Sequence, residues 1–155
     1  MPTPLSSTAG LQVVDLGSSD YAGVLDLQRR WAEERAQGRR ADTLILVEHP
    51  HVITRGTGFK GKTPGTAEGA QNGLGGLLGS VPVFDVERGG DATYHGPGQL
   101  VGYPILHLKE RNLGISEYLR ELEEALIQAV SPWCQAGRLP GFTGVWSGNK
   151  KIASI

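Results

Sequence analysis

The stretch Arg88–Ile105, RGGDATYHGPGQLVGYPI, concentrates residue types that can do chemistry. Arg88 offers a fixed fork of donors to an anionic or carbonyl group. The glycine pair after it lets the main chain adopt positive φ and approach another molecule with no Cβ in the way. The run Thr93–His95 adds a hydroxyl, a phenol and an imidazole. Any one of these residues fits an ordinary turn, but their density predicts a binding or catalytic loop.

Other candidate chemistries are weaker in this sequence. The stretch lacks the lysine-containing phosphate-loop pattern and does not lead from a strand directly into a helix, so a nucleotide cradle is not indicated. Turn or core roles are expected for His49, His51 and His107, and because no histidine pair has metal spacing beside acidic residues, no metal is expected. The only cysteine, Cys134, is interpreted as a small buried apolar side chain.

Two adjacent lysines stand on a predicted strand near the end of the sequence. Alternation along a strand sends Lys150 and Lys151 to opposite faces. A lysine that points inward needs an anionic partner. One of the two is therefore a candidate for stabilising a thiolate or an oxyanion.

Composition narrows the class of protein. The chain has 155 residues, 39% of them hydrophobic and 20% charged, which suits one folded domain. Its formal net charge of -1 favours neither nucleic acid nor an anionic membrane as a partner. No apolar run is long enough for a transmembrane helix, and the first ten residues do not resemble a signal peptide, so a cytoplasmic location is expected.

Periodicity predicts an α+β domain with helices packed on a mixed, mainly antiparallel sheet. Two helices are expected, one over 18–40 that Ser19 or Asp20 caps and Gly38 ends, and one over 116–130 that Ser116 caps. Strands are expected over 11–17, 44–50, 51–56, 81–87 and 100–108, followed by a hairpin over 142–155. A long glycine-rich loop is expected over 56–80, and residues 1–10 are expected to form a flexible N-terminus.

The central stretch resembles the signature of the lipoyl(octanoyl) transferases, also called the lipoate-protein ligase B family. The matching positions read Arg88-Gly89-Gly90-x-x-Thr93-Tyr94-His95-x-x-Gly98-Gln99-x-Val101-x-Tyr103. The segments LDLQRRWAEERAQG, LILVEHPHVITRG and GVWSGNKKIASI agree in order and character, with a mild departure at EHPH. The resemblance covers residues 11–155 and implies one catalytic domain of the biotin/lipoate protein ligase type.

The resemblance implies a transfer reaction without a cofactor. Members take an octanoyl group from acyl carrier protein and place it on a lysine of lipoyl domains, such as those of 2-oxoacid dehydrogenases and the glycine cleavage H protein. The group passes through a thioester on an enzyme cysteine, whose pKa the lysine at Lys151 lowers. The residues implied in substrate binding are Arg88, Gly89, Gly90, Asp91, Ala92, Thr93, Tyr94, His95, Ser154 and Ile155.

One part of the family pattern is missing. The nucleophile of the family lies in a Pro-Cys-Gly segment downstream of the lysine, whereas this sequence stops at Ile155 and Cys134 lies upstream. We therefore expect a domain that is incomplete at its C-terminal end, with weak or absent transferase activity. The alternatives are a non-catalytic module that binds an acyl chain or acyl carrier protein, and an ATP-dependent ligase of the same fold.

Overall fold

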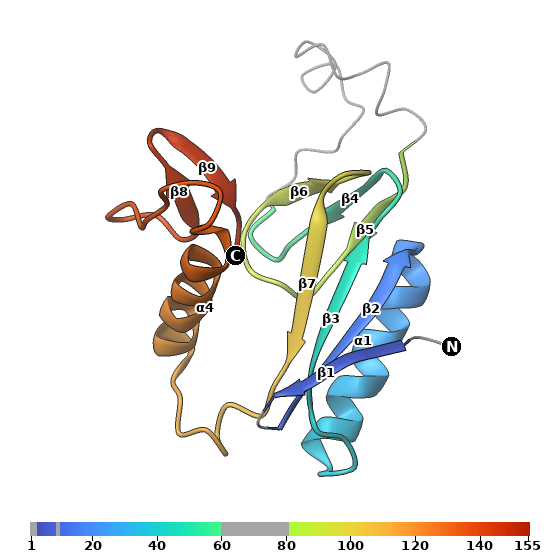
Figure 1. Cartoon of the computed structure of the whole chain (residues 1–155). Coiled ribbons are helices and arrows are strands. Elements are labelled where there is room, and N and C mark those ends of the chain that lie inside the picture. Colours follow the sequence, from blue (N-terminus) through green and yellow to red (C-terminus); the bar gives the residue numbers. More distant parts are fainter. Residues whose placement is uncertain (1–2, 9, 60–80) are drawn as a thin grey trace. The chain divides into compact units, whose positions relative to one another are not determined.

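The computed structural model describes residues 3–8, 10–59 and 81–155, with the backbone alone for 3–8 (Figure 1). Most of the loop expected over 56–80 lies outside the described residues. The chain divides into two compact units, Met1–Leu106 and His107–Ile155. The single domain expected over 11–155 stays a prediction.

The first unit contains a four-stranded sheet in the order β1-β2-β3-β7. Its strands are β1 (Thr3–Thr8), β2 (Leu11–Ser18), β3 (Asp42–Glu48) and β7 (Leu100–Ile105). The range expected to be a flexible terminus thus contains β1, which pairs antiparallel with β2. Strand β7 contains Pro104 and lies at a sheet edge, where a missing N–H is tolerated, as the sequence predicts.

Helix α1 (Tyr21–Ala36) connects the parallel strands β2 and β3. It begins where the Asp20 carboxylate accepts a hydrogen bond from the Gly23 amide at 2.8 Å, as the sequence predicts. It stops before Gly38, whose φ of 71° glycine adopts without strain. Arg35 and Asp42, both nearly buried, then form an ion pair of 2.6 Å that joins the end of the helix to β3.

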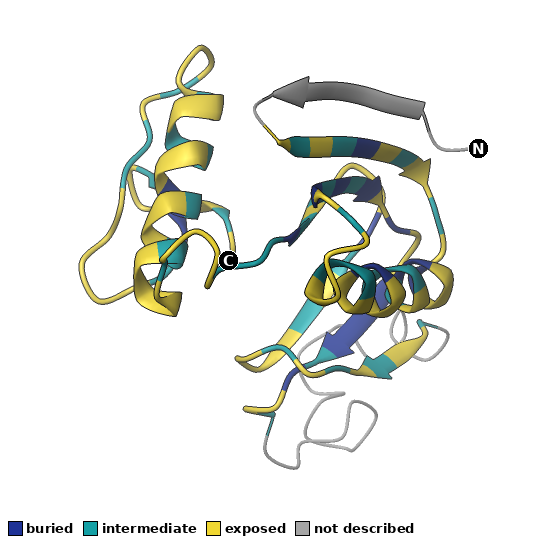
Figure 2. Ribbon diagram, turned by 90° about the horizontal axis from the view of Figure 1, so that it is seen from below, coloured by how far each residue is buried: buried dark blue, intermediate teal, exposed yellow. Residues whose placement is uncertain are grey.

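The core of the first unit lies between α1 and one face of this sheet. Trp31 of the helix packs with Val14, Ile45 and Ile105 of three strands. Figure 2 shows the buried positions gathered on β3 and on one side of α1. The buried residues of the helix, Tyr21, Val24 and Trp31, recur at helical spacing and therefore form one apolar face.

A second, three-stranded sheet of the first unit carries the candidate loop. Its order is β5-β4-β6, with β4 (Val52–Arg55), β5 (Val83–Asp85) and β6 (Ala92–His95). Strand β4 is buried at Val52–Thr54 and pairs antiparallel with β6. The strand expected over 81–87 is shorter because Pro82 has no N–H and serves only through its carbonyl, which accepts from Ile53 at 2.9 Å.

The second unit consists of α4 (Ile115–Val130) and the hairpin β8 (Val145–Ser147) and β9 (Lys150–Ala153). The expected Ser116 cap is wrong, since the N-cap is Gly114. The Gly114 amide instead donates to the Glu117 carboxylate at 2.6 Å, which satisfies one helix-end donor without a cap side chain. The hairpin turns at Gly148 and Asn149, between β8 and β9, which confirms the predicted Ser-Gly-Asn turn.

The predicted fold class is confirmed. Pairs β2–β3 and β4–β5 are parallel and the other described pairs are antiparallel, so the sheets are mixed and mainly antiparallel, with helices against them. In the described part of the chain, no helix combines the length and apolar character that crossing a membrane requires.

We expect Ile45→Ala to lower the free energy of unfolding by about 2–5 kcal/mol, because it leaves a cavity in the core. Ile45 is fully buried, whereas Leu100 of the same sheet is 67% exposed. Leu100→Ala is therefore the control and should change stability by less than about 0.5 kcal/mol. Urea denaturation followed by circular dichroism measures both, and equal losses would contradict this description of the core.

Candidate functional site

The loop Arg88–Asp91 is held by its own carbonyl groups. Three consecutive amides, those of Gly56–Gly58, donate to the carbonyls of Asp91, Arg88 and Gly90 over 3.1, 3.0 and 2.9 Å. The loop therefore directs these carbonyl oxygens inward, onto the segment that follows β4. Gly90 has a φ of 81°, so the sharp bend uses a conformation that favours glycine.

Contact between the two segments is too close for any side chain at Gly56. A Cβ at this position would lie 2.7 Å from the Gly90 oxygen and 2.8 Å from the oxygens of Arg88 and Gly89. Gly56 itself is buried. A Cβ at Gly89, by contrast, would meet nothing within 4 Å. Gly56 thus makes the close approach possible, and the loop is open on its outer side at Gly89.

The Arg88 guanidinium points at β4. Its Nη2 donates to the Thr54 carbonyl at 2.8 Å and to the Thr54 hydroxyl at 2.9 Å, and its Nη1 donates to the Gly89 carbonyl at 2.9 Å. Thr54 is buried. The fork of donors that the sequence offers to a ligand therefore fixes the loop to β4. A role for Arg88 in substrate binding stays a prediction.

The signature residues after the loop form β6, and alternation separates them. Thr93 and His95 are half-buried on one face of the strand, while Ala92 and Tyr94 are exposed. The phenol of Tyr94 hydrogen-bonds Nδ1 of His51. The imidazole that can do chemistry is thus directed inward, and the phenol lies at the surface.

The His95 imidazole is held in one tautomer. Its Nδ1 lies 2.7 Å from Oε1 of Gln99, an oxygen that can only accept, so Nδ1 carries the proton and Nε2 keeps a lone pair. Burial lowers the pKa of His95, and the electrostatic effects of His49 and Arg88 add to this, against the hydrogen bond that His95 donates to Gln99. His95 is therefore neutral at pH 7 and can accept a proton or a hydrogen bond at Nε2.

Aromatic rings from α1, β5, β7 and the connection after β3 form a cluster with His95. Tyr21 stacks on it at 6.4 Å between ring centroids, and Tyr21 also contacts Phe84 at 5.0 Å and His49 at 5.2 Å. His49 lies 6.2 Å from His95 and 5.9 Å from Tyr103. Burial raises the pKa values of Tyr21 and Tyr103, so both phenols stay protonated.

His49 links the four-stranded sheet to the start of α1 and contacts the three-stranded sheet through the ring of His95. Its Nδ1 donates to the carbonyl of Ser19, just before α1, at 2.8 Å, and its Nε2 accepts from the Tyr103 hydroxyl of β7 at 3.0 Å. It is 1% exposed. His49 lies in the connection between β3 and β4, where the sequence predicts a turn role, and it is also a buried part of the wall behind His95. Sequence reasoning missed this wall because its residues are far apart along the chain.

The remaining predicted site residues lie in the second unit. Lys151 is exposed on β9, opposite Trp146 of β8, with its Nζ 5.7 Å from the indole centroid. Its neighbour Lys150 is exposed as well, so neither lysine is buried. Ser154 and Ile155 follow β9 and are exposed. Their place in a substrate site stays a prediction.

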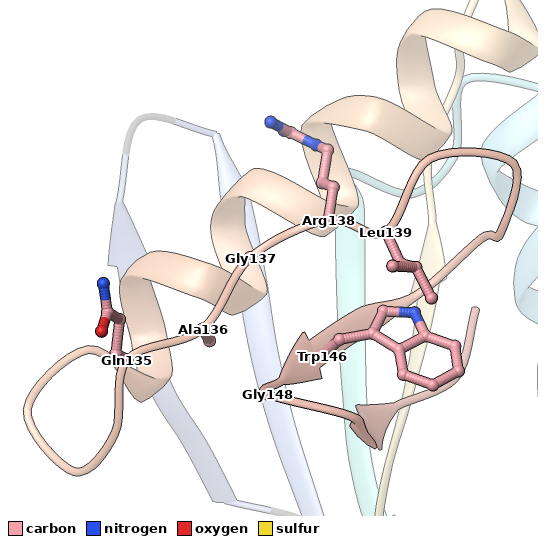
Figure 3. A pocket seen from close by; sticks show the side chains of 7 residues that line it. All are labelled: Gln135, Ala136, Gly137, Arg138, Leu139, Trp146 and Gly148. Atoms are coloured by element: carbon pink, nitrogen blue, oxygen red, sulfur yellow. The ribbon is translucent and has the colours of Figure 1, made fainter.

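The second unit also contains an open pocket of about 270 Å³ (Figure 3). Its lining residues are Gln135, Ala136, Gly137, Arg138, Leu139, Trp146 and Gly148. Nε1 of Trp146 is buried and has no hydrogen-bond partner in the described part of the chain. Cys134, next to this pocket in sequence, is half-buried. Among the described residues, no cluster of three or more His, Cys, Asp or Glu side chains could hold a metal.

Comparison with known proteins shows what this chain is similar to. The family model of the lipoyl protein ligase A/B catalytic domain matches residues 20–155. The chain is 46% identical over 141 residues to an octanoyltransferase of Solibacter usitatus, covering 90% of this chain and 62% of that protein. It is 44% identical to an octanoyltransferase of Geobacter sulfurreducens, covering 94% and 57%. The chain thus spans about three fifths of the length of these relatives.

We expect Gly56→Ala to lower the free energy of unfolding by about 1–3 kcal/mol, because the methyl group would overlap three carbonyl oxygens. Gly89→Ala adds the same methyl group where nothing lies within 4 Å, so it should change stability by less than about 0.5 kcal/mol. Thermal or urea unfolding compares the two variants. A Gly56→Ala protein as stable as Gly89→Ala would show that the loop is not clamped in this way.

We expect His95 to titrate below the ordinary histidine pKa of about 6.5. Gln99→Ala removes the hydrogen bond that opposes the effect of burial, so the pKa of His95 should fall further. NMR titration of the imidazole signals measures both values, with Gln12→Ala, an exposed change on β2, as the control. A rise in the variant would show that Gln99 is not the acceptor of the Nδ1 proton.

Proposed function

The chain belongs to the family of lipoyl protein ligase A/B catalytic domains. We propose that it binds an octanoyl group and takes part in its transfer. The observation that carries this proposal is the clamped Arg88–Asp91 loop beside a neutral, half-buried His95. The curated relatives named octanoyltransferase support the same reaction. The proposed donor is octanoyl-acyl carrier protein, and the proposed acceptor is a lysine of a lipoyl domain.

The reaction needs two acyl transfers. A thiolate attacks the thioester carbonyl of the donor, the carbonyl carbon–sulphur bond to the carrier breaks, and the carrier leaves as a thiolate that takes a proton from solvent. The lysine amine of the lipoyl domain then attacks the new thioester, forms the amide, loses its proton to a base and releases the thiolate. Because a thioester is already activated, no nucleotide is needed. The side of the loop at Gly89, where a Cβ would meet nothing within 4 Å, is where we propose that a backbone amide stabilises the oxyanion.

His95 and Lys151 take separate roles in this proposal. His95, neutral and with a lone pair on Nε2, is suited to accept a hydrogen bond from a substrate or to take the amine proton. Lys151 supplies an ammonium group, which favours the thiolate form of a cysteine. The family resemblance places that cysteine in a Pro-Cys-Gly segment. We therefore do not assign the nucleophile to Cys134, which follows Trp133 after α4.

The other proposed binding residues are carried over from the resemblance. They are Gly89, Gly90, Asp91, Ala92, Thr93 and Tyr94 in the first unit, and Ser154 and Ile155 in the second. The single catalytic domain over 11–155 and the cytoplasmic location likewise stay predictions.

We expect the chain to bind a non-hydrolysable octanoyl-pantetheine analogue, in which a methylene group replaces the thioester sulphur, saturably and with a stoichiometry of one. His95→Ala should weaken this binding by about tenfold, the effect of losing one hydrogen bond in a partly buried site. His107→Ala, which removes an imidazole from the turn after β7, is the control and should leave affinity unchanged. Isothermal titration calorimetry measures all three proteins, and absence of binding to the wild type would exclude the proposed acyl site.

Incubation with octanoyl-acyl carrier protein and a lipoyl domain, followed by mass spectrometry, separates the alternatives. Octanoylated lipoyl domain formed without ATP supports the transferase. Acyl binding with no transfer supports a non-catalytic binding module, and a product that appears only with ATP supports a ligase. An octanoyl thioester on Cys134 would overturn the assignment made for that residue.

A further inference from the structure

The second unit is built around one buried carboxylate that no step above uses. Glu123 of α4 is fully buried. Arg120 donates to it at 2.6 Å and Arg138 at 3.1 Å, and both arginines are partly exposed. The third donor is the backbone amide of Gly144, at 2.9 Å. A carboxylate with this many donors is held rigidly and stays ionised. The pKa of Glu123 lies below its usual range, mainly because of the hydrogen bond from the Gly144 amide. The two arginines lower this pKa further, whereas burial opposes the shift.

Gly144 in turn forms the surface on which Lys151 lies. A Cβ on Gly144 would be 2.5 Å from Cε of Lys151, 3.2 Å from its Nζ and 2.5 Å from the Ala153 oxygen. The φ of Gly144 is 119°, a conformation that residues with side chains rarely adopt. The lysine stem therefore rests directly on the bare backbone that the Glu123 carboxylate holds.

The end of the lysine has a second neighbour on the same hairpin. Trp146 is the register partner of Lys151, and the ammonium nitrogen lies 5.7 Å from its indole centroid. This is within the range in which a cation is attracted to an aromatic face. Gly144 below and Trp146 beside it thus leave Lys151 with a defined position, although the side chain is exposed.

We propose that Glu123, acting through the Gly144 amide, is a positioning residue that fixes the Lys151 ammonium group for acyl transfer. Its importance for the reaction rests on the role proposed for Lys151. The structural part of the proposal is that the contact between Lys151 and Gly144 depends on Glu123. This part does not depend on the role of Lys151 in the reaction. The two parts can be tested separately.

The first experiment fills the space under the lysine. Gly144→Ala places a methyl group where Cε of Lys151 lies, so the nuclear Overhauser effect between the Lys151 ε-methylene protons and the Trp146 ring should be lost. Gly148→Ala is the matched control, because Gly148 also has positive φ (58°) in this hairpin but meets nothing within 4 Å. It should keep that effect. Cross-strand contacts between Val145 and Ala153 report whether the hairpin has formed.

The second experiment changes the carboxylate itself. In the wild type, three donors share the two carboxylate oxygens of Glu123, whereas Glu123→Gln leaves them a single acceptor oxygen. The nuclear Overhauser effect between the Lys151 ε-methylene protons and the Gly144 α protons should therefore weaken at least about twofold. Glu124→Gln is the matched control, because Glu124 is also bonded to Arg138, at 3.0 Å, but has no bond to Gly144. It should leave this contact unchanged. Should Gly144→Ala fail to form the hairpin, this pair of variants decides.

Transfer kinetics test the consequence for the reaction. Gly144→Ala and Glu123→Gln should lower kcat by about 10- to 100-fold with KM unchanged, since a small displacement of a reacting group has effects of this size. Wild-type contacts and rates in both variants would overturn the proposal. If Lys151→Met transfers octanoyl groups at the wild-type rate, the role proposed for Lys151 in the reaction fails. If no protein transfers them, the contact measurements alone decide the role of Glu123.

Discussion

Backbone carbonyls that meet backbone amides at one glycine determine the shape of the candidate site. Because Gly56 has no side chain, the segment after β4 lies against the Arg88–Asp91 loop and donates three successive amides to it. Each bond is worth only about 1 kcal/mol, but together they leave the loop one conformation. The Arg88 guanidinium, bonded to Thr54, fastens the same loop from the other side. The open side is thereby free to face a ligand.

The aromatic wall behind β6 extends this rigidity to the imidazole. His49 is bonded at both ring nitrogens, to the chain before α1 and to β7 of the four-stranded sheet, and its ring contacts His95 of the three-stranded sheet. His95 lies against this wall with one nitrogen held by Gln99. Burial and hydrogen bonding thus select both its charge and its tautomer, the two properties on which acid–base chemistry at a histidine depends.

Much of the fold follows from local patterns in the sequence. The Asp20 cap, the Gly38 stop, the edge position of the proline-containing strand and the Ser-Gly-Asn hairpin turn are local signals, because each needs only a few neighbouring residues. The cap of α4 was missed, since a Glu117 side chain that reaches back to the Gly114 amide replaces the usual N-cap side chain. Strand β5 is shorter than the strand expected over 81–87, because Pro82 has no N–H at its start and pairing with β4 ends at Asp85.

By itself, the sequence determined the class of fold, the glycine-rich loop and the family resemblance, because these depend on residue types and spacing within short windows. Only the tertiary structure decided that Arg88 bonds to Thr54, that His49 is a buried link, and that Glu123 holds the backbone under Lys151. These contacts join residues separated by between 21 and 54 positions. Spacing along the chain carries no signal for them, since folding alone brings a donor to its acceptor over such separations.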